Sequence, residues 1–229
     1  MYLRDLTVHA DDAIVDRYKA GFVQRFHREA CSVVESYLAE IYRKVVTGCT
    51  AKVGFTFTDE TDELPHHSLQ RHFYPWPFDF AAYTASSTNA KQRLVLDALQ
   101  EALIWIARRE EWDIDPFYAA YKAIIDRNFE FVGYSQKSWM CPRKQFRARL
   151  FFNWHLGGID LYAVLFHNRS KTELARLPLG TGVPMAGILH EYLNAGKWES
   201  NTKFVVAAST PIRKTWIVDF AGPITTNAT

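Results

Sequence analysis

Seven acidic and histidine side chains lie within fourteen residues, and their chemistry could serve a metal ion or a protein partner. They are Asp59, Glu60, Asp62, Glu63, His66, His67 and His72. Carboxylate oxygens and imidazole nitrogens are common ligands of divalent metals. However, adjacent histidines on a strand point to opposite sides, and no two of these histidines have the i, i+4 spacing of a helical metal site. We therefore expect no metal ion at this stretch.

The same stretch has the composition of a loop that recognises another protein. Its four carboxylates would attract a basic partner, and the aromatic residues that follow them would anchor that partner. Loops of this length without a repeating pattern are commonly functional or disordered. The sequence predicts these partner-binding residues: Asp59, Glu60, Asp62, Glu63, His66, His67, His72, Tyr74 and Trp76.

A second candidate site lies in the basic segment 137–176, where eight lysines and arginines accompany two acidic residues. Arginines between aromatic residues could bind a phosphate-bearing ligand or stack on single-stranded nucleic acid. The residues predicted for this alternative are Arg147, Arg149, His155, Asp160 and Tyr162. The segment lacks the glycine–aromatic signature of RNA-binding sheets, and Phe146 and Trp154 fall on the predicted core face. We therefore rank a protein partner above nucleic acid.

The sequence contains no recognisable catalytic motif. There is no G-x-S-x-G, and the His190-Glu191 pair lacks the second histidine of H-E-x-x-H. His155 and Asp160 are predicted cross-strand neighbours, and a carboxylate beside an imidazole can orient it for catalysis. A purely structural pair at a turn is the other interpretation. We expect no catalytic residues and no cofactor.

Hydrophobic periodicity predicts the helices. Apolar residues at steps of three and four from Ile14 to Val46 predict a long N-terminal helix of about 35 residues. A second helix is expected to begin at Ser87 or Thr88. A third begins where Asp115 can cap it and Pro116 takes its first turn. A fourth runs from Pro184 to Asn194, after a glycine-rich stretch (LPLGTGVPMAG) that reads as a plain turn.

Alternating apolar residues predict three β-hairpins, over residues 51–83, 144–168 and 203–220. In the second hairpin, Gly157 and Gly158 suit a two-residue turn because both can adopt positive φ. That turn pairs His155 with Asp160 on the face opposite the core. In the first hairpin, Pro75 and Pro77 lack backbone donors, so they belong at a sheet edge or before the strand begins.

These elements predict an α+β fold: an antiparallel sheet with the long N-terminal helix and two or three further helices packed on it, in a single domain over residues 1–229. Three widely spaced cysteines do not form a disulfide framework, and no apolar run of eighteen residues is present, so we expect a cytoplasmic protein with no membrane partner. The sequence does not determine its oligomeric state.

Two functional hypotheses remain open. The first is a non-catalytic protein that neutralises a partner, such as a toxin or effector domain, by covering its active site in the manner of a bacterial immunity protein or antitoxin. The second is an enzyme or binder of a phosphate-bearing or nucleic-acid ligand that uses the basic hairpin 143–169.

Overall fold

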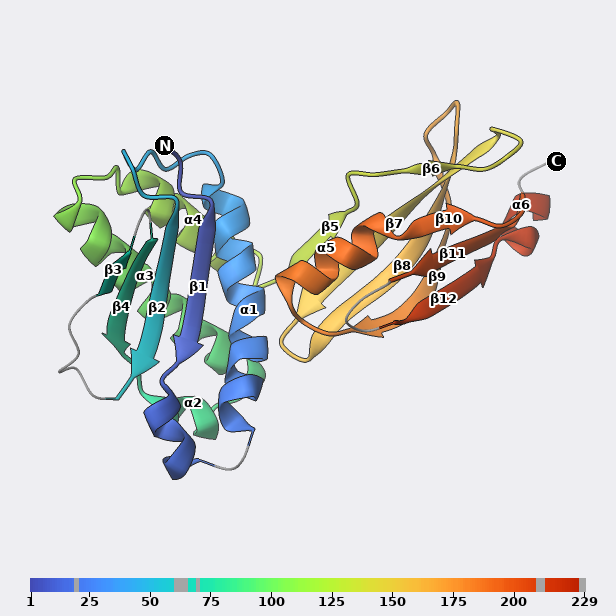
Figure 1. Cartoon of the computed structure of the whole chain (residues 1–229). Coiled ribbons are helices and arrows are strands. Elements are labelled where there is room, and N and C mark those ends of the chain that lie inside the picture. Colours follow the sequence, from blue (N-terminus) through green and yellow to red (C-terminus); the bar gives the residue numbers. More distant parts are fainter. Residues whose placement is uncertain (19–20, 60–65, 69–70, 209–212, 227–229) are drawn as a thin grey trace. The chain divides into compact units, whose positions relative to one another are not determined.

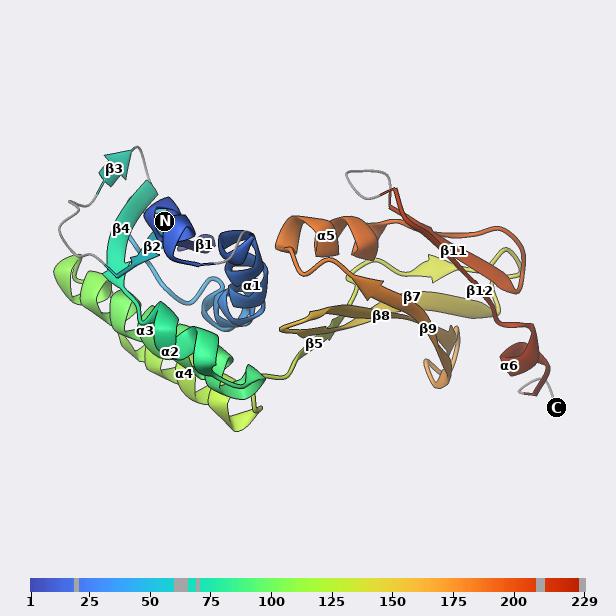
Figure 2. The same ribbon diagram turned by 90° about the horizontal axis from the view of Figure 1, so that it is seen from below.

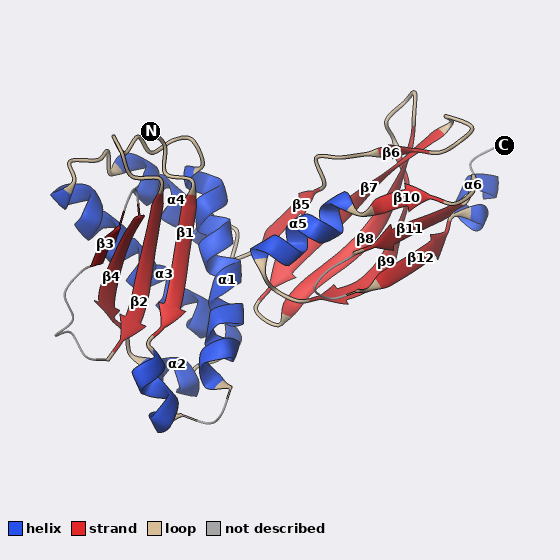
Figure 3. Cartoon of the chain, in the orientation of Figure 1, coloured by secondary structure: helices blue, strands red, loops and turns tan. Residues whose placement is uncertain are grey.

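The computed structural model describes residues 1–18, 21–59, 66–68, 71–208 and 213–226 (Figure 1). The chain forms two compact units, unit 1 over Met1–Glu130 and unit 2 over Phe131–Thr229. Helices and antiparallel strands occur together, as expected for an α+β chain (Figure 3). The single domain stays a prediction, because two compact units in one chain can unfold together or separately.

Unit 1 contains a mixed sheet and not the antiparallel one that was predicted. Its strands are β1 (Asp5–Ala10), β2 (Lys52–Thr58), β3 (His66–Ser68) and β4 (Arg71–Pro77). Their order is β1-β2-β4-β3, with β1, β2 and β4 parallel and β3 antiparallel to β4 (Figure 1). The prediction of a β-hairpin over residues 51–83 is therefore wrong. The short strand β3 reverses the chain first, so that β4 returns parallel to β2.

The end of β4 explains the prolines of this segment. Pro75 and Pro77 pair with β2, whereas the described pairing of β3 with β4 ends at Phe73. A missing backbone donor is tolerated at such a half-paired position. The following residues, expected to form a strand, fold instead as α2 (Phe80–Ala85), because the Asp79 side chain accepts a hydrogen bond from the Ala82 backbone at 2.8 Å and caps the helix.

The predicted N-terminal helix of about 35 residues is also wrong. The segment forms a 3₁₀ helix η1 (Asp12–Arg17) and then α1 (Phe22–Ile41), which has 20 residues. Gly21, with φ of 80°, separates the two, and Arg43, with φ of 60°, follows the end of α1. Both backbone conformations are incompatible with a continuous right-handed helix. The apolar stripe persists past the helix because the next segment also contributes to the core.

The other helices of unit 1 agree well with the sequence. α3 (Thr88–Arg109) and α4 (Asp115–Asp126) begin at the predicted residues, but the N-cap of α4 is Ile114 and not Asp115, and neither N-cap side chain accepts a hydrogen bond from its helix. α1 packs against β1 and α3 against β4, and α4 packs on both helices. Figure 2 shows α2, α3 and α4 together on one side of the sheet. The core between these layers is rich in aromatic residues, including Phe26, Phe55 and Phe57.

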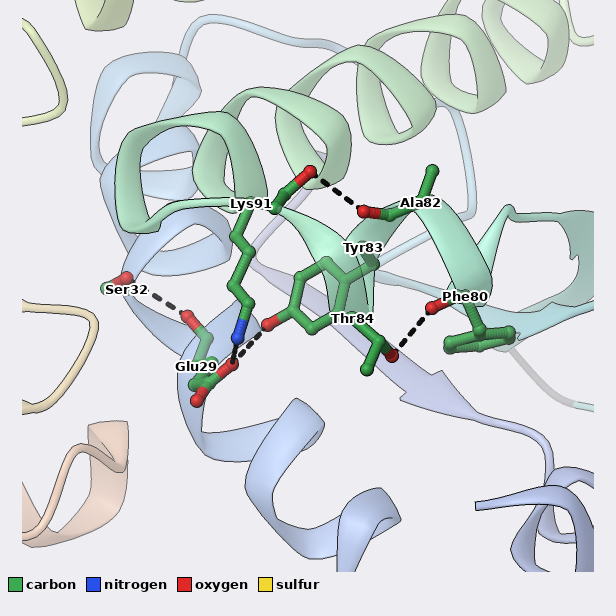
Figure 4. A network of polar contacts seen from close by, with 8 residues as sticks. Glu29, Ser32, Phe80, Ala82, Tyr83, Thr84 and Lys91 are labelled. Carbon is green, nitrogen blue, oxygen red and sulfur yellow. Dashed lines mark hydrogen bonds and ion pairs between the residues drawn. The ribbon is translucent and has the colours of Figure 1, made fainter. Parts of the chain in front are cut away.

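A polar cluster joins three helices of unit 1 (Figure 4). The Glu29 carboxylate of α1 accepts a hydrogen bond from the Tyr83 hydroxyl of α2 at 2.5 Å. It also lies 3.4 Å from the Lys91 ammonium of α3. Both charged side chains are largely buried, so each needs the other and the tyrosine to offset the loss of hydration. The cluster fixes how α1, α2 and α3 meet.

Unit 2 contains two antiparallel sheets. The larger sheet comprises β5 (Phe131–Tyr134), β6 (Trp139–Met140), β7 (Phe146–His155), β8 (Gly158–His167) and β9 (Glu173–Gly182), in the order β5-β7-β8-β9 with β6 beside β7. The smaller comprises β10 (Gly196–Trp198), β11 (Lys203–Ala207) and β12 (Thr215–Asp219). Helices α5 (Ala186–Asn194) and α6 (Ala221–Thr226) complete the unit. The predicted hairpins 144–168 and 203–220 are confirmed.

The β7–β8 turn is displaced by one residue from its predicted place. Leu156 and Gly157 form the turn, and Gly158 begins β8, so Trp154 pairs with Ile159 and not with Leu161. A Cβ atom at Gly158 would lie 2.6 Å from Thr181 Cγ2, so this glycine serves close strand packing. The displacement moves each pairing by two residues. The two faces of the hairpin are therefore those that the sequence predicted.

Strand β9 was not predicted. The glycine-rich stretch that reads as a turn supplies the second half of this strand, from Leu177 to Gly182. Gly180 takes a φ of 133° and lies against the Trp216 ring of β12. Glycine can adopt this φ within a strand, although propensity scales count glycine as a strand-breaking residue.

Of the helices in the described part of the chain, none is both long and apolar enough to cross a membrane.

Candidate functional site

The residues of the basic hairpin lie on one face of the larger sheet of unit 2. Inward side chains of β7, among them Leu150 and Trp154, are buried in the core. Because side chains alternate along a strand, their neighbours point outward. The outward positions of β7 and their partners on β8 are Arg147 with Phe166, Arg149 with Val164, Phe151 with Tyr162, and Asn153 with Asp160. The five residues of the alternative prediction therefore share this face.

A pocket opens at one end of this face, and we call it the basic pocket. Its volume is about 340 Å³, which is at the lower end of the range for small-ligand sites. It is lined by Arg147, Arg149, Phe166, His167, Asn168 and Lys171. No carboxylate is among these lining residues. The pocket therefore gathers positive charge without an internal counter-ion.

The cations of the basic pocket keep donors free for a ligand. Arg149 donates from Nε and Nη2 to the Ser135 carbonyl, at 3.1 and 2.6 Å, which holds its guanidinium in place. The side chains of Arg147 and Lys171 form no ion pair or hydrogen bond with any residue that the structure describes. Unpaired cations of this kind favour an anionic ligand.

His167 adds a further donor to the basic pocket. Its Nδ1 accepts a hydrogen bond from the Ser170 backbone N–H at 3.2 Å. An acceptor at Nδ1 places the proton of the neutral imidazole on Nε2. His167 therefore offers an N–H group and not a lone pair, which again suits an anion and not a metal.

Aromatic rings extend from the basic pocket along the outward face, and we call this set the aromatic face. It consists of Tyr134, Phe151, Tyr162 and Phe166, all partly exposed. Ring centroids are 5.1 Å apart for Tyr134 and Phe151, 6.0 Å for Phe151 and Tyr162, and 6.1 Å for Tyr134 and Phe166. The outward side of the sheet thus combines flat apolar rings with arginines.

The acidic groups near this face are paired within the protein. Glu173 and Arg176 form two hydrogen bonds of 3.1 Å, and this interaction with Arg176 holds the pKa of Glu173 below its ordinary value. Asp160 accepts a hydrogen bond from Thr181 at 2.7 Å and lies 3.4 Å from His155 Nε2. Because these carboxylates are engaged, they do not oppose an anion in the basic pocket.

The predicted His155–Asp160 pair exists, but as diagonal neighbours and not as direct cross-strand partners. His155 Nδ1 accepts from the Gly157 backbone N–H at 3.2 Å, so Nε2 carries the proton that faces the Asp160 carboxylate. The two side chains are 46% and 35% exposed at the hairpin end. A structural role of the pair at the turn stays a prediction.

The predicted partner-binding loop falls largely outside the described residues. Glu60, Asp62 and Glu63 lie outside them. His66, His67 and His72 belong to β3 and β4, but their side chains are not described. Asp59 pairs with Arg17.

The two aromatic residues predicted for this loop have different environments. Tyr74 is only 1% exposed, because it faces the helices under β4, so its predicted role as an anchor is wrong. Trp76 lies beside an open groove of about 620 Å³, which we call the tryptophan groove. It is lined by Trp76, Gln100, Glu101, Ile104, Trp105, Arg108, Arg109 and Tyr118.

The floor of the tryptophan groove contains an unsatisfied donor. Gln100 is 8% exposed, and its Oε1 accepts a hydrogen bond from the buried Tyr37 hydroxyl. Its Nε2 is buried and has no hydrogen-bond partner among the described residues. Trp105, which is 39% exposed, packs edge-on against Tyr74 and beside Trp76. The groove therefore offers two indole rings, whereas the Gln100 amide is buried.

A strip of titratable side chains runs between β1 and α1. His9 and His27 stack with ring centroids 4.9 Å apart. Burial, followed by the neighbouring His27, lowers the pKa of His9. Burial also raises the pKa of Cys31 to about 12, so its thiol is a poor nucleophile and metal ligand. No cluster of three or more metal-ligating groups occurs in the described residues.

Sequence reasoning missed the part of the site that comes from the end of β8 and from β5. Phe166, His167 and Asn168 were not singled out, and neither was Tyr134. Strand parity puts Phe166 on the same outward face as Tyr162, but Phe166 was not proposed as a ligand-binding residue. The turn after β8 reverses the chain and brings Lys171 beside Arg147.

Comparison with protein-family models, curated proteins and solved structures finds no match for this chain.

Proposed function

We propose that unit 2 binds a phosphate-bearing ligand in the basic pocket. The observation that carries this proposal is the pair of unpaired cations, Arg147 and Lys171, in a pocket without a lining carboxylate. A guanidinium can hold two phosphate oxygens at once, and an ammonium adds a point charge. The Nε2–H of His167 and the remaining N–H groups of Arg149 complete a set suited to several oxygen atoms.

The distribution of charge along the chain supports the same proposal. Unit 2 contains twelve lysines and arginines and five aspartates and glutamates, a net charge of +7. Unit 1 contains fifteen lysines and arginines and twenty aspartates and glutamates, a net charge of −5. The small net charge of the whole chain therefore conceals a strongly basic unit. A basic unit attracts anionic ligands and accelerates their association.

The proposal is for binding and not for catalysis. The residues that line the basic pocket include no serine, threonine, cysteine or carboxylate that could attack or deprotonate a substrate. His167 is the lining residue that could act as a general base, and its Nδ1 already accepts a backbone hydrogen bond. The arrangement suits the binding of an anion that is later released without chemical change.

Calorimetric titration with pyrophosphate and with ATP tests the proposal. The double variant Arg147→Gln/Lys171→Gln should bind each ligand at least about tenfold more weakly, because each lost charged hydrogen bond contributes roughly 1.5–3 kcal/mol. The matched control is Arg28→Gln/Lys122→Gln, which removes two exposed cations from unit 1 and should leave affinity unchanged. Equal affinity of wild type and the pocket variant would refute the proposal, as would no binding by the wild type.

A second function, recognition of a protein partner by unit 1, is favoured by the tryptophan groove. Exposed tryptophans are typical anchors of protein interfaces, and Trp105, which is 39% exposed, lies beside Trp76 in this groove. The acidic residues at 59–63 would then steer a basic partner towards the same unit. This candidate keeps the inhibitory role of an immunity-protein or antitoxin type as a proposal.

Affinity capture from cells of the source organism tests this second function. Trp105→Ala should lose a specifically captured partner, and replacement of Asp59, Glu60, Asp62 and Glu63 by serine should slow its association. Tyr118→Ala probes the rim of the groove, and Tyr42→Ala is the control, since Tyr42 is exposed but lies elsewhere on unit 1. If Trp105→Ala retains every partner with unchanged affinity, the groove is not the docking element.

A further inference from the structure

We infer that the ligand of unit 2 is single-stranded nucleic acid, with a phosphate in the basic pocket and bases on the aromatic face. This inference rests on the proposed function, because it needs the basic pocket to hold a phosphate. Sequence reasoning ranked nucleic acid lower since Phe146 and Trp154 fall on the core face. Trp154 is indeed buried, yet the four rings of the aromatic face point outward.

Two rings of the aromatic face have a side that a base could cover. Tyr162 and Phe166 lie on β8, and each makes one tilted ring contact within the aromatic face, to Phe151 and to Tyr134 respectively. No cation of the described chain lies over either ring. Every nucleobase has a flat face, so stacking on such rings tolerates any sequence.

The spacing of these two rings selects a single strand. Tyr162 and Phe166 are four residues apart on β8, which separates their Cα atoms by about 13 Å. Neighbouring bases in a duplex are stacked about 3.4 Å apart and are already covered on both faces. Bases that occupy both rings must therefore be unstacked from one another, which an extended single strand permits and a duplex does not.

The arginines of the face add further flat surfaces between the two rings. Arg176 lies 4.1 Å from the centroid of Phe151, and Arg149 lies 4.9 Å from that of Tyr134. A guanidinium whose one side rests on a ring presents its other side to an incoming base. The charge of Arg149 also continues into the basic pocket. Phosphate binding and base stacking are thus contiguous on one sheet.

Fluorescence anisotropy with labelled twelve-nucleotide strands, dT12 and rU12, tests the inference. Tyr162→Leu should weaken binding of at least one strand by about 5- to 100-fold, because one stacked base is lost. Tyr162→Trp should restore it. Tyr42→Leu is the matched control: Tyr42 is exposed on unit 1 and, like Tyr134 and Phe151 of the aromatic face, has an arginine over it, Arg43 at 5.3 Å. It should leave affinity unchanged.

A duplex of the same length and the salt dependence distinguish stacking from charge alone. The duplex should bind more weakly than the single strand and should be insensitive to Tyr162→Leu. In wild type, the logarithm of affinity should fall with the logarithm of salt concentration, and Arg147→Gln/Lys171→Gln should reduce that slope by about 1.4, the loss of two phosphate contacts.

The outcomes separate this inference from the proposed function. If pyrophosphate binds but dT12 and rU12 bind no more tightly, or if Tyr162→Leu has no effect on a strand that binds, the inference is overturned and the phosphate pocket stands. If duplex and single strand bind equally and both depend only on the cations, the ligand is recognised by charge and the stacking role is overturned. If neither pyrophosphate nor any strand binds, both proposals fail together.

Discussion

The guanidinium of Arg176 lies 4.1 Å from the centre of the Phe151 ring, although the two residues belong to β9 and β7 and the strand β8 runs between them. Arg176 pairs with Val164 on β8, so its side chain reaches over that valine to the ring. The edge of the guanidinium donates hydrogen bonds to Glu173 and to the Tyr134 hydroxyl. The outward face of unit 2 is therefore organised by contacts among its own side chains before any ligand arrives.

This stack predicts a measurable coupling between the two residues. In a double-mutant cycle with Arg176→Gln and Phe151→Leu, the free energies of unfolding should be non-additive by about 0.5–1 kcal/mol, the usual strength of an exposed cation–π contact. Denaturant titration provides the measurement. The same cycle on Arg43 and Tyr42, where the cation lies 5.3 Å from a more exposed ring, should give a smaller coupling. Additive effects at Arg176 and Phe151 would mean that the contact contributes no stability.

Glu35 predicts how the stability of unit 1 depends on pH. Burial, and then the nearby Asp5 carboxylate, raise the pKa of Glu35 from 4.5 to about 7. The folded protein therefore binds a proton that the unfolded chain releases between these values, so this group makes stability decline as pH rises from about 4.5 to above 7. Glu35→Gln removes the penalty and should stabilise the protein at pH 8 by at most about 3 kcal/mol.

Denaturation midpoints at pH 5 and pH 8 measure this effect. The gain from Glu35→Gln should be much smaller at pH 5, where the native carboxyl is already protonated. Glu101→Gln, an exposed change on α3, is the control and should show little dependence on pH. An equal gain at both pH values would show that Glu35 is not protonated in the folded protein at pH 5.

The cysteines should differ sharply in their reactivity. Cys49 is exposed, Cys141 is buried, and the pKa of Cys31 is raised to about 12 by burial and by Glu35. At pH 8 only about one Cys31 in ten thousand is a thiolate, the reactive form. Treatment with iodoacetamide followed by peptide mass spectrometry should therefore show Cys49 modified first. All three should react in urea. Rapid native modification of Cys31 would contradict its buried environment.

The polar cluster of Figure 4 predicts the cost of losing one hydroxyl group. Tyr83→Phe removes the 2.5 Å hydrogen bond to Glu29 and leaves that buried carboxylate with Lys91 at 3.4 Å. Hydrogen bonds to charged groups contribute about 1.5–3 kcal/mol, and the free energy of unfolding should fall by that amount. Tyr118→Phe, at a tyrosine that is 48% exposed, should cost little. If the two variants are equally stable, the cluster does not join the helices as described.

Strand periodicity explains why the composition of the candidate face was predictable although its register was not. Arg147, Arg149 and Tyr162 have outward parity whichever residues form the turn, because an error of two in the pairing leaves every side chain on its face. Gly158, which follows the turn, lies so close to Thr181 of β9 that a Cβ atom there would be 2.6 Å from Thr181 Cγ2. That contact joins segments far apart in the sequence. Local turn preferences at Gly157 contain no information about it.

The helices show the same division between local and non-local causes. The starts of α3 and α4 agree with local signals, Ser87 or Thr88 for α3 and the Asp115-Pro116 pair for α4, so the sequence located them closely. The end of α1 could not be predicted in this way, because an apolar stripe indicates which residues are buried and not which backbone conformation they adopt. Val45 is buried beyond the end of α1 and continued the stripe. Likewise, the parallel pairing of β2 with β4 depends on β3 reversing the chain, which alternation of apolar residues cannot reveal.

By itself, the sequence determined which residues point to the core and which to solvent on β7 and β8, since side-chain alternation is a property of each strand alone. It also determined that the chain is basic around residues 137–176. Only the tertiary structure decided that Lys171 and His167 close a pocket beside Arg147, and that Gln100 and Trp105 form a groove with Trp76. Those neighbours come from turns and crossing elements, whose geometry depends on long-range packing and not on local propensity.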